Sequence, residues 1–211
     1  ITPWNLPLYL LSWKVAPALL MGNTIVAKPS EMTPMTASLL AEVMEEVELP
    51  NGVFNLVHGN GLDAGAPLTS HPDVNLISFT GGTATGREVA KSASSGFKKL
   101  SLELGGKNAT IIREDANLDE MMPSIVRASF LNQGQVCLCG SRILIHESIY
   151  DSFVKGFLEV VSDMIVGDPS DDQTELGALI SADHRDKVMS YIELADEEGG
   201  DILCGGGAPI G

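Results

Sequence analysis

The first half of the chain alternates short apolar runs with stretches whose apolar residues recur at helical spacing. The short runs are bounded by turn residues such as Pro50-Asn51-Gly52, which is typical of strands, and Asn23–Ala27 is apolar enough to predict a buried strand. Thr33-Pro34 predicts a helix start, with Thr33 as the N-cap and proline at the first helical position. The pattern predicts strands at 23–27, 53–57, 74–79 and 99–103, and helices at 35–47, 62–70 and 83–93.

The alternation restarts after Gly105-Gly106, and we place a domain boundary at Leu104-Gly105-Gly106. Asp115 or Asn117 would open the first helix beyond it, and Gly199-Gly200 would end the last. Strands are predicted at 109–112, 142–146 and 201–204, and helices at 118–130, 148–165 and 185–198. The predicted organisation is two partial α/β domains, residues 1–104 and 105–211.

Strand–helix–strand repetition at this spacing predicts a doubly wound, Rossmann-like parallel sheet with right-handed crossovers, followed by a second α/β domain. Ligands of such sheets bind beyond the carboxyl ends of the strands. Lys28, His58, Thr80-Gly81 and Glu103 all lie at or just past the ends of predicted strands. This edge of the first sheet is therefore the predicted ligand site.

The formal net charge of −15 argues against binding to nucleic acid or to anionic membranes. Fifteen of the 28 acidic residues, but only three of the 13 basic ones, follow Ile145. We therefore expect an acidic surface on the second domain, whereas the first is neutral enough to bind an anionic ligand. The apolar opening Leu6–Met21 is interrupted by Pro7, Lys14 and Pro17, so no transmembrane helix is predicted.

Three cysteines, an odd number, do not suggest a disulfide framework and favour a reducing, cytoplasmic compartment. The Cys137-x-Cys139 spacing is poor for zinc, so no metal site is predicted. The chain opens at Ile1 without a basic segment or a cleavage site, so we expect no signal peptide. We interpret the sequence as a fragment of a longer protein.

Two residues are candidates for covalent and acid–base chemistry. Cys137 follows the polar segment Asn132-Gln133-Gly134-Gln135-Val136, and its alternative interpretation is a small core residue. Because no histidine lies nearby in the sequence, a Cys–His hydrolase is not supported. Glu103 ends an otherwise apolar strand, so it is either a structural acid paired with Lys99 or Lys107, or a general base whose pKa is raised by burial.

Two further segments are candidates for nucleotide binding. Gly81-Gly82-Thr83-x-x-Gly86 lies between a predicted strand and a helix, where backbone N–H groups could face a pyrophosphate; Gly59-x-Gly61-x-x-x-Gly65 is a weaker match to a dinucleotide motif. Both could equally be ordinary tight turns. Glu31, three residues after Lys28, could accept hydrogen bonds from ribose hydroxyls, or the two could form a solvated pair.

Taken together, these features closely resemble the NAD(P)-dependent aldehyde dehydrogenase superfamily. The resemblance covers nearly the whole chain and depends on segments in the family's order and spacing. These segments are Pro3-Trp4-Asn5, Lys28-Pro29-Ser30-Glu31, Phe79-Thr80-Gly81, Leu102-Glu103-Leu104-Gly105-Gly106-Lys107 and Asn132-Gln133-Gly134-Gln135-x-Cys137.

The resemblance implies a role for each matching residue. Cys137 would attack the aldehyde carbonyl, the Asn5 amide and the Cys137 N–H would hold the oxyanion, and Glu103 would activate the water that hydrolyses the thioester. NAD would be the cofactor, favoured over NADP by Glu31. Its binding residues would be Trp4, Lys28, Glu31, Gly61, Gly65, Thr80, Gly81, Gly82 and Leu104, with Lys14 near the active site.

The chain also departs from the family pattern. Gly82 replaces a common serine and Thr85 a common aliphatic residue, which removes a hydroxyl from the phosphate site and an apolar contact beside the adenine. The family's later Glu-x-Phe-Gly-Pro segment is absent, so we expect this stretch alone to be inactive. The resemblance also implies that the full-length protein is a homodimer or homotetramer. Cys139 is expected to be a buried neighbour without a catalytic role, and Cys204 a core residue.

The substrate is expected to be a small aldehyde. Segments 1–11 and 132–142 most resemble the branch of the family that oxidises 2-aminomuconic semialdehyde in tryptophan (kynurenine) breakdown. Retinal and betaine aldehyde are alternatives. A non-catalytic NAD-binding or structural relative is the alternative from another class, although such proteins usually lose the nucleophile or the base.

Overall fold

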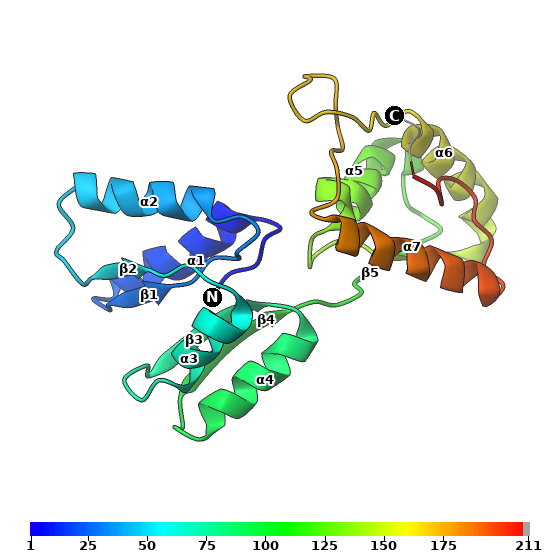
Figure 1. Cartoon of the computed structure of the whole chain (residues 1–211). Helices are drawn as coiled ribbons and strands as arrows, with labels where there is room; N and C mark the ends of the chain where they lie inside the picture. Colours follow the sequence, from blue (N-terminus) through cyan, green and yellow to red (C-terminus); the bar gives the residue numbers. More distant parts are fainter. Residues whose placement is uncertain (209–211) are drawn as a thin grey trace. The chain divides into compact units, whose positions relative to one another are not determined.

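The six strands of the described chain form three parallel pairs, and a helix connects the two strands of each pair. The computed structural model describes residues 1–208. The pairs are β1 (Ile25–Ala27) with β2 (Phe54–Leu56), β3 (Leu76–Gly81) with β4 (Lys99–Leu104), and β5 (Ala109–Ile112) with β6 (Arg142–Ile145). The connecting helices are α2 (Met35–Glu46), α4 (Thr83–Ser94) and α5 (Leu118–Phe130) (Figure 1). The prediction of an α/β fold with parallel strands is confirmed.

The chain forms two compact units, which divide between Gly105 and Gly106. In the first unit, the segment Ile1-Thr2 runs between two strand pairs. The Thr2 N–H donates to the Lys28 carbonyl oxygen (3.1 Å), and Ile1 exchanges backbone bonds with Ser78 and Thr80 of β3 (2.8 and 3.1 Å). This segment therefore joins the end of β1 to β3 and brings Lys28 and Thr80 to the same part of the unit.

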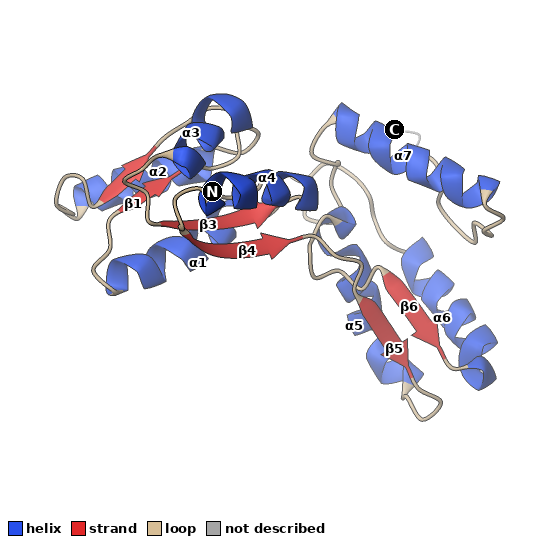
Figure 2. Cartoon of the chain, turned by 90° about the horizontal axis from the view of Figure 1, so that it is seen from below, coloured by secondary structure: helices blue, strands red, loops and turns tan. Residues whose placement is uncertain are grey.

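Apolar faces of three helices build the core of the first unit. Leu11 and Val15 of α1 (Pro7–Leu20) pack with Ala27 and with Ala37 of α2. A second cluster joins alternate residues of β3 to α4 through Ile77, Phe79, Val89 and Ala93. Figure 2 shows α4 lying along one face of the β3–β4 pair. Because Ser78 alternates with Ile77 and Phe79, its side chain faces away from α4.

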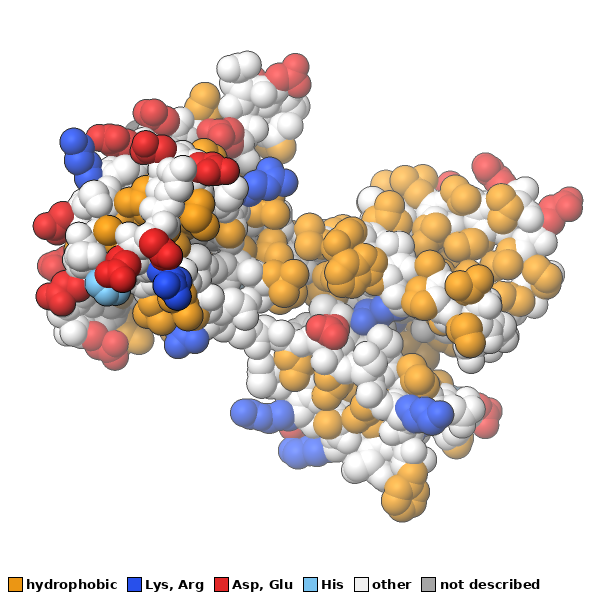
Figure 3. Space-filling view, turned by 180° about the vertical axis from the view of Figure 1, so that it is seen from behind, with side chains coloured by type: hydrophobic (Ala, Val, Ile, Leu, Met, Phe, Trp, Pro, Cys, Tyr) orange, Lys and Arg blue, Asp and Glu red, His pale blue; other side chains and the backbone are white. Residues whose placement is uncertain are grey.

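In the second unit, α5 and α6 (Tyr150–Ser162) pack on the β5–β6 pair around Ile112, Met122, Ile125 and Phe153. The last helix, α7 (Ala182–Glu197), buries no side chain. Acidic side chains gather on the surface of this unit (Figure 3), in line with the charge asymmetry of the sequence. Short helical turns cover Gly61–Gly65 (η1), Ala66–Ser70 (α3), Leu131–Gly134 (η2) and Glu147–Ile149 (η3).

Several local predictions are wrong. Pro7–Leu20 forms α1, although no element was predicted there. The N-cap position of α2 is occupied by Pro34, not by Thr33. The Thr33 hydroxyl donates to the Trp4 carbonyl oxygen (3.4 Å) and does not cap the helix. Residues 201–204 are not a strand, and Cys204 is exposed, not in the core. Val26 in β1 is 44 % exposed, so that strand is less buried than predicted. Among residues 1–208, no helix is both long and apolar enough to cross a bilayer.

Candidate functional site

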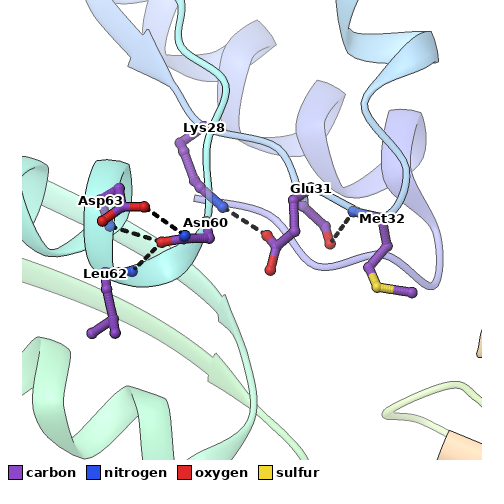
Figure 4. Close-up of polar contacts among 7 residues, drawn as sticks. Lys28, Glu31, Met32, Asn60, Leu62 and Asp63 are labelled. Atoms are coloured by element: carbon purple, nitrogen blue, oxygen red, sulfur yellow. Dashed lines mark hydrogen bonds and ion pairs between the residues drawn. The ribbon is translucent and has the colours of Figure 1, made fainter. Parts of the chain in front are cut away.

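A buried lysine and an exposed glutamate meet at the end of β1 (Figure 4). Lys28 is only 4 % exposed, and its Nζ lies 3.0 Å from Oε2 of Glu31, which is 52 % exposed. A hydrogen bond from its own backbone, and then the Lys28 ammonium, hold the pKa of Glu31 below its ordinary value. The pair is thus anchored at the lysine, and its carboxylate keeps a charged, accessible acceptor face.

The turn after β2 lies beside this pair. Asn60 caps η1: its Oδ1 accepts from the N–H groups of Leu62 (2.9 Å) and Asp63 (2.8 Å) (Figure 4). This cap fixes Gly61 at an exposed position and Gly65 at a buried one. No atom would lie within 4 Å of a Cβ at either glycine. His58, a predicted edge residue, contacts the Ser38 hydroxyl through Nε2 (3.3 Å).

The N-terminus of α4 has the features of an anion site. Gly82 is at the N-cap position and offers no side-chain acceptor, so the first N–H groups of this 12-residue helix are not capped by it. Just before it, the Thr80 hydroxyl is buried without a hydrogen-bond partner among the described residues. A Cβ on Gly81 would lie 2.5 Å from Cζ of Phe79, which explains the glycine there.

Glu103 lies on β4 in register with Thr80. Its side chain is exposed, so the expected burial of this carboxylate is wrong for the described chain, and it forms no ion pair with Lys99 or Lys107 among residues 1–208. Lys14 of α1 donates to the Ser78 hydroxyl (2.9 Å); burial lowers its pKa, and the charge of Glu103 partly offsets that. These contacts place a carboxylate and an ammonium on the face of β3–β4 opposite α4.

The remaining predicted residues of the first unit have clear positions. Trp4 and Asn5 are half-buried just before α1, and the Trp4 carbonyl oxygen ties them to the loop that carries Glu31. The Leu104 side chain packs closely against Gly86 of α4. A Cβ on Gly86 would lie only 2.6 Å from Cδ2 of Leu104. Any contact of Leu104 with a ligand would therefore involve its backbone.

Cys137 belongs to the second unit. Its thiol is free and its side chain half-buried, and its carbonyl oxygen accepts from Nδ2 of Asn108 (2.8 Å). Cys139 is buried, as expected for a neighbour without a catalytic role. Asn108 was not among the predicted residues, and no role was predicted for the Gln135 side chain, which accepts from the N–H of Ile180. Within residues 1–208, no group of three or more side chains could hold a metal ion.

The first unit thus has parallel strands, an accessible carboxylate after β1 and no side-chain cap at the start of α4. In α/β folds of this kind, ligands bind beyond the carboxyl ends of the strands. The match to the aldehyde dehydrogenase family model covers residues 1–210, and the chain belongs to this family.

Curated relatives and solved structures give the same result. The chain is 53 % identical over 207 residues to a 2-aminomuconic semialdehyde dehydrogenase of Mus musculus, covering 98 % of this chain and 42 % of that protein. It is 47 % identical to a betaine aldehyde dehydrogenase of Bacillus subtilis, covering 99 % and 43 %. A structure of betaine aldehyde dehydrogenase from Staphylococcus aureus in complex with NAD+ matches with a TM-score of 0.96 and 43 % identity, covering 99 % and 41 %. The chain thus spans less than half the length of these relatives.

Proposed function

We propose that the full-length protein oxidises an aldehyde to a carboxylic acid with NAD, using Cys137 as the nucleophile. The observation that carries this proposal is the setting of Cys137. Cys137 has a free, half-buried thiol and follows a tightly turned loop. Its backbone carbonyl oxygen accepts a hydrogen bond from the Asn108 side chain. A partly exposed thiol can react with a ligand, whereas a fully buried core cysteine cannot.

The residues of the first unit fit NAD. The exposed carboxylate of Glu31, fixed by Lys28, would accept from the hydroxyls of the adenosine ribose and disfavour a 2′-phosphate. The start of α4 and the buried Thr80 hydroxyl would bind the pyrophosphate together with Gly81, Gly82 and Trp4. Gly61, Gly65 and the backbone of Leu104 would allow close approach elsewhere along the cofactor. Bound NAD would supply the hydride acceptor.

Cys137 would carry the covalent chemistry. Its thiolate forms a carbon–sulfur bond to the aldehyde carbon, giving a hemithioacetal whose oxyanion the Asn5 amide and the Cys137 N–H stabilise. Hydride from that carbon would pass to bound NAD, and the thioester would remain on Cys137. Glu103 takes a proton from water, which attacks the thioester and releases the acid and the thiolate. A soft nucleophile and a separate base thus perform the two halves of the reaction without a histidine.

The test uses the full-length protein with an aldehyde and NAD. Cys137→Ser should abolish turnover, whereas Glu103→Gln should still form one equivalent of NADH per site and then stall with an acyl group on Cys137, detectable by mass spectrometry. Cys204→Ser, at an exposed cysteine, is the matched control and should retain activity. Stoichiometric NAD binding without any turnover would instead favour a binding-only relative.

For the substrate we propose 2-aminomuconic semialdehyde, because relatives with that name are 52–53 % identical to this chain in several organisms. Betaine aldehyde is the second candidate, supported by the Bacillus subtilis relative at 47 % identity. Comparing kcat/KM for the two aldehydes decides between them. We further propose a reducing, cytoplasmic setting, consistent with three free cysteines, and a homodimer or homotetramer.

A further inference from the structure

Three consecutive residues before Cys137 have a left-handed backbone. The φ angles are +53° at Asn132, +59° at Gln133 and +71° at Gly134. Glycine adopts this conformation readily and asparagine tolerates it, but it is unfavourable for Gln133. Such a turn persists only where surrounding contacts hold it.

The side-chain amide of Gln135 makes two of these contacts. Its Nε2 donates to the Asn132 carbonyl oxygen (3.3 Å), across the strained turn. Its Oε1 accepts from the N–H of Ile180 (3.1 Å), 45 residues further along the chain. One planar amide thus ties the turn to the segment that leads into α7, and both of its polar atoms take part.

The residues around Cys137 are fixed from other directions. Asn108, just before β5, donates to the Cys137 carbonyl oxygen (2.8 Å). The N–H of Cys139 donates to the Val136 carbonyl oxygen, and the N–H of Gly140 to that of Ala128. Asn108 and the backbone thus hold the residues around Cys137, whereas the Gln135 side chain holds the strained turn before it.

We infer that Gln135 is a positioning residue for Cys137, acting by locking this turn; the inference rests on the proposed role of Cys137 as nucleophile. Without the amide, the backbone bond from the Gln135 N–H to the Asn132 carbonyl oxygen (3.0 Å) remains, but the tie to Ile180 is lost. The turn can then relax toward more favourable backbone angles and displace the Cys137 thiol. Displacement of a reacting group by about 1 Å can lower the rate about a hundred-fold, whereas binding of the aldehyde need not change.

The experiment compares Gln135→Met with Gln135→Glu in the full-length protein. Methionine preserves the length of the side chain but loses the hydrogen bonds of the amide, whereas glutamate retains the acceptor for Ile180. Gln135→Met should lower kcat about ten- to a hundred-fold with little change in KM or NAD affinity, and glutamate should recover part of the loss. Gln173→Met, in an exposed loop of the same unit, is the matched control and should behave as the wild type.

Cysteine labelling separates positioning from unfolding. With a small alkylating reagent and mass spectrometry, Gln135→Met should label faster than wild type at Cys137, while the buried Cys139 stays protected. Unchanged kcat and unchanged labelling would overturn the inference, and so would faster labelling of both cysteines with a loss of folded protein. If wild type and Gln173→Met turn over no aldehyde, the proposed function fails, whereas the labelling comparison still decides whether Gln135 holds the loop.

Discussion

At the scale of single residues, the Lys28–Glu31 pair at the end of β1 differs from an ordinary surface ion pair because its lysine is buried. An exposed Lys–Glu pair three residues apart contributes little. Here the lysine is 4 % exposed, so its ammonium has lost most of its water and is compensated by the Glu31 carboxylate. The carboxylate itself remains half exposed, and it can accept from a ligand without giving up that ion pair.

The lowered pKa of Glu31 predicts a pH dependence of stability. A carboxyl group whose pKa is lower in the folded state stabilises the fold at pH values above its unfolded pKa of about 4.5, and this contribution disappears as the pH falls through the folded pKa. At pH 7 the Glu31→Gln protein should therefore have a lower free energy of unfolding than wild type, by less than about 1 kcal/mol because the group is exposed. Urea unfolding between pH 7 and pH 3 measures the difference, which should close in acid.

The control for this prediction is Glu46→Gln at the end of α2, an exposed carboxylate without an ion pair among the described residues. It removes one surface carboxylate without touching Lys28, so it measures the effect of the charge change alone. A difference between Glu31→Gln and wild type that stays constant down to pH 3 would contradict the linkage.

The sequence identified residues whose neighbours along the chain define their chemistry, such as Glu31 beside Lys28. It did not identify Asn108, and it gave no role to Gln135 beyond its place in the motif. Their partners, Cys137 and Ile180, lie 29 and 45 residues away, so no local pattern records the contact. It also misjudged Glu103, because an acid between leucines suggests burial, whereas the side chains on that face of β4 remain exposed in the described chain.

At the scale of elements, periodicity was a good guide where an element has one apolar face and a partner. The strand at 109–112 and the helix at 118–130 were predicted with their observed bounds, and Asn117 caps that helix. The helix at 7–20 was missed because Pro7 and Pro17 suggested interruption. Pro7 is tolerated in the first turn, and Leu11, Val15 and Leu19, spaced by four, pack on β1 and α2 in spite of Pro17. Residues 201–204 have strand-like composition but no ladder partner in the described chain.

The start of α4 predicts a gain of cofactor affinity. A Cβ at Gly82 would meet nothing within 4 Å, and its φ of −70° suits any residue. Gly82→Ser would add a hydroxyl donor beside the proposed pyrophosphate site. One such hydrogen bond, worth about 0.5–1.5 kcal/mol, should lower the Kd for NAD about two- to thirteen-fold in calorimetry on the full-length protein.

Gly82→Ala is the matched variant, because it adds the Cβ without the hydroxyl and should leave the Kd near that of wild type. Equal affinities of the serine and alanine variants would place the pyrophosphate away from this helix start. A weaker affinity in both would indicate that the cofactor backbone needs the space that Gly82 leaves.

At the scale of the whole molecule, many large apolar side chains of the described chain lie outside its hydrophobic clusters and remain exposed. Tyr9 and Trp13 of α1 are 53 % and 58 % exposed, and Met35 at the start of α2 is 71 % exposed. Figure 3 shows broad hydrophobic areas over the first unit. Contiguous apolar surface on a folded domain commonly marks a place where further chain or a partner packs. The relatives are more than twice as long as this chain, which makes further segments of the same protein the natural cover.

This leads to a prediction about the 211 residues expressed alone. They contain the proposed nucleophile and base but less than half the length of the curated relatives, and no Glu-x-Phe-Gly-Pro segment. The isolated chain should form no NADH from an aldehyde and NAD under conditions in which the full-length protein turns over, and its exposed apolar side chains should enhance the fluorescence of a hydrophobic dye. As a control, a separate sample of the soluble, folded chain is treated with an alkylating reagent. Labelling of Cys137 shows that the thiol is intact, so that a lost thiol does not explain the inactivity. Steady NADH formation by the isolated chain, abolished by Cys137→Ser, would show instead that these residues alone suffice for both halves of the reaction.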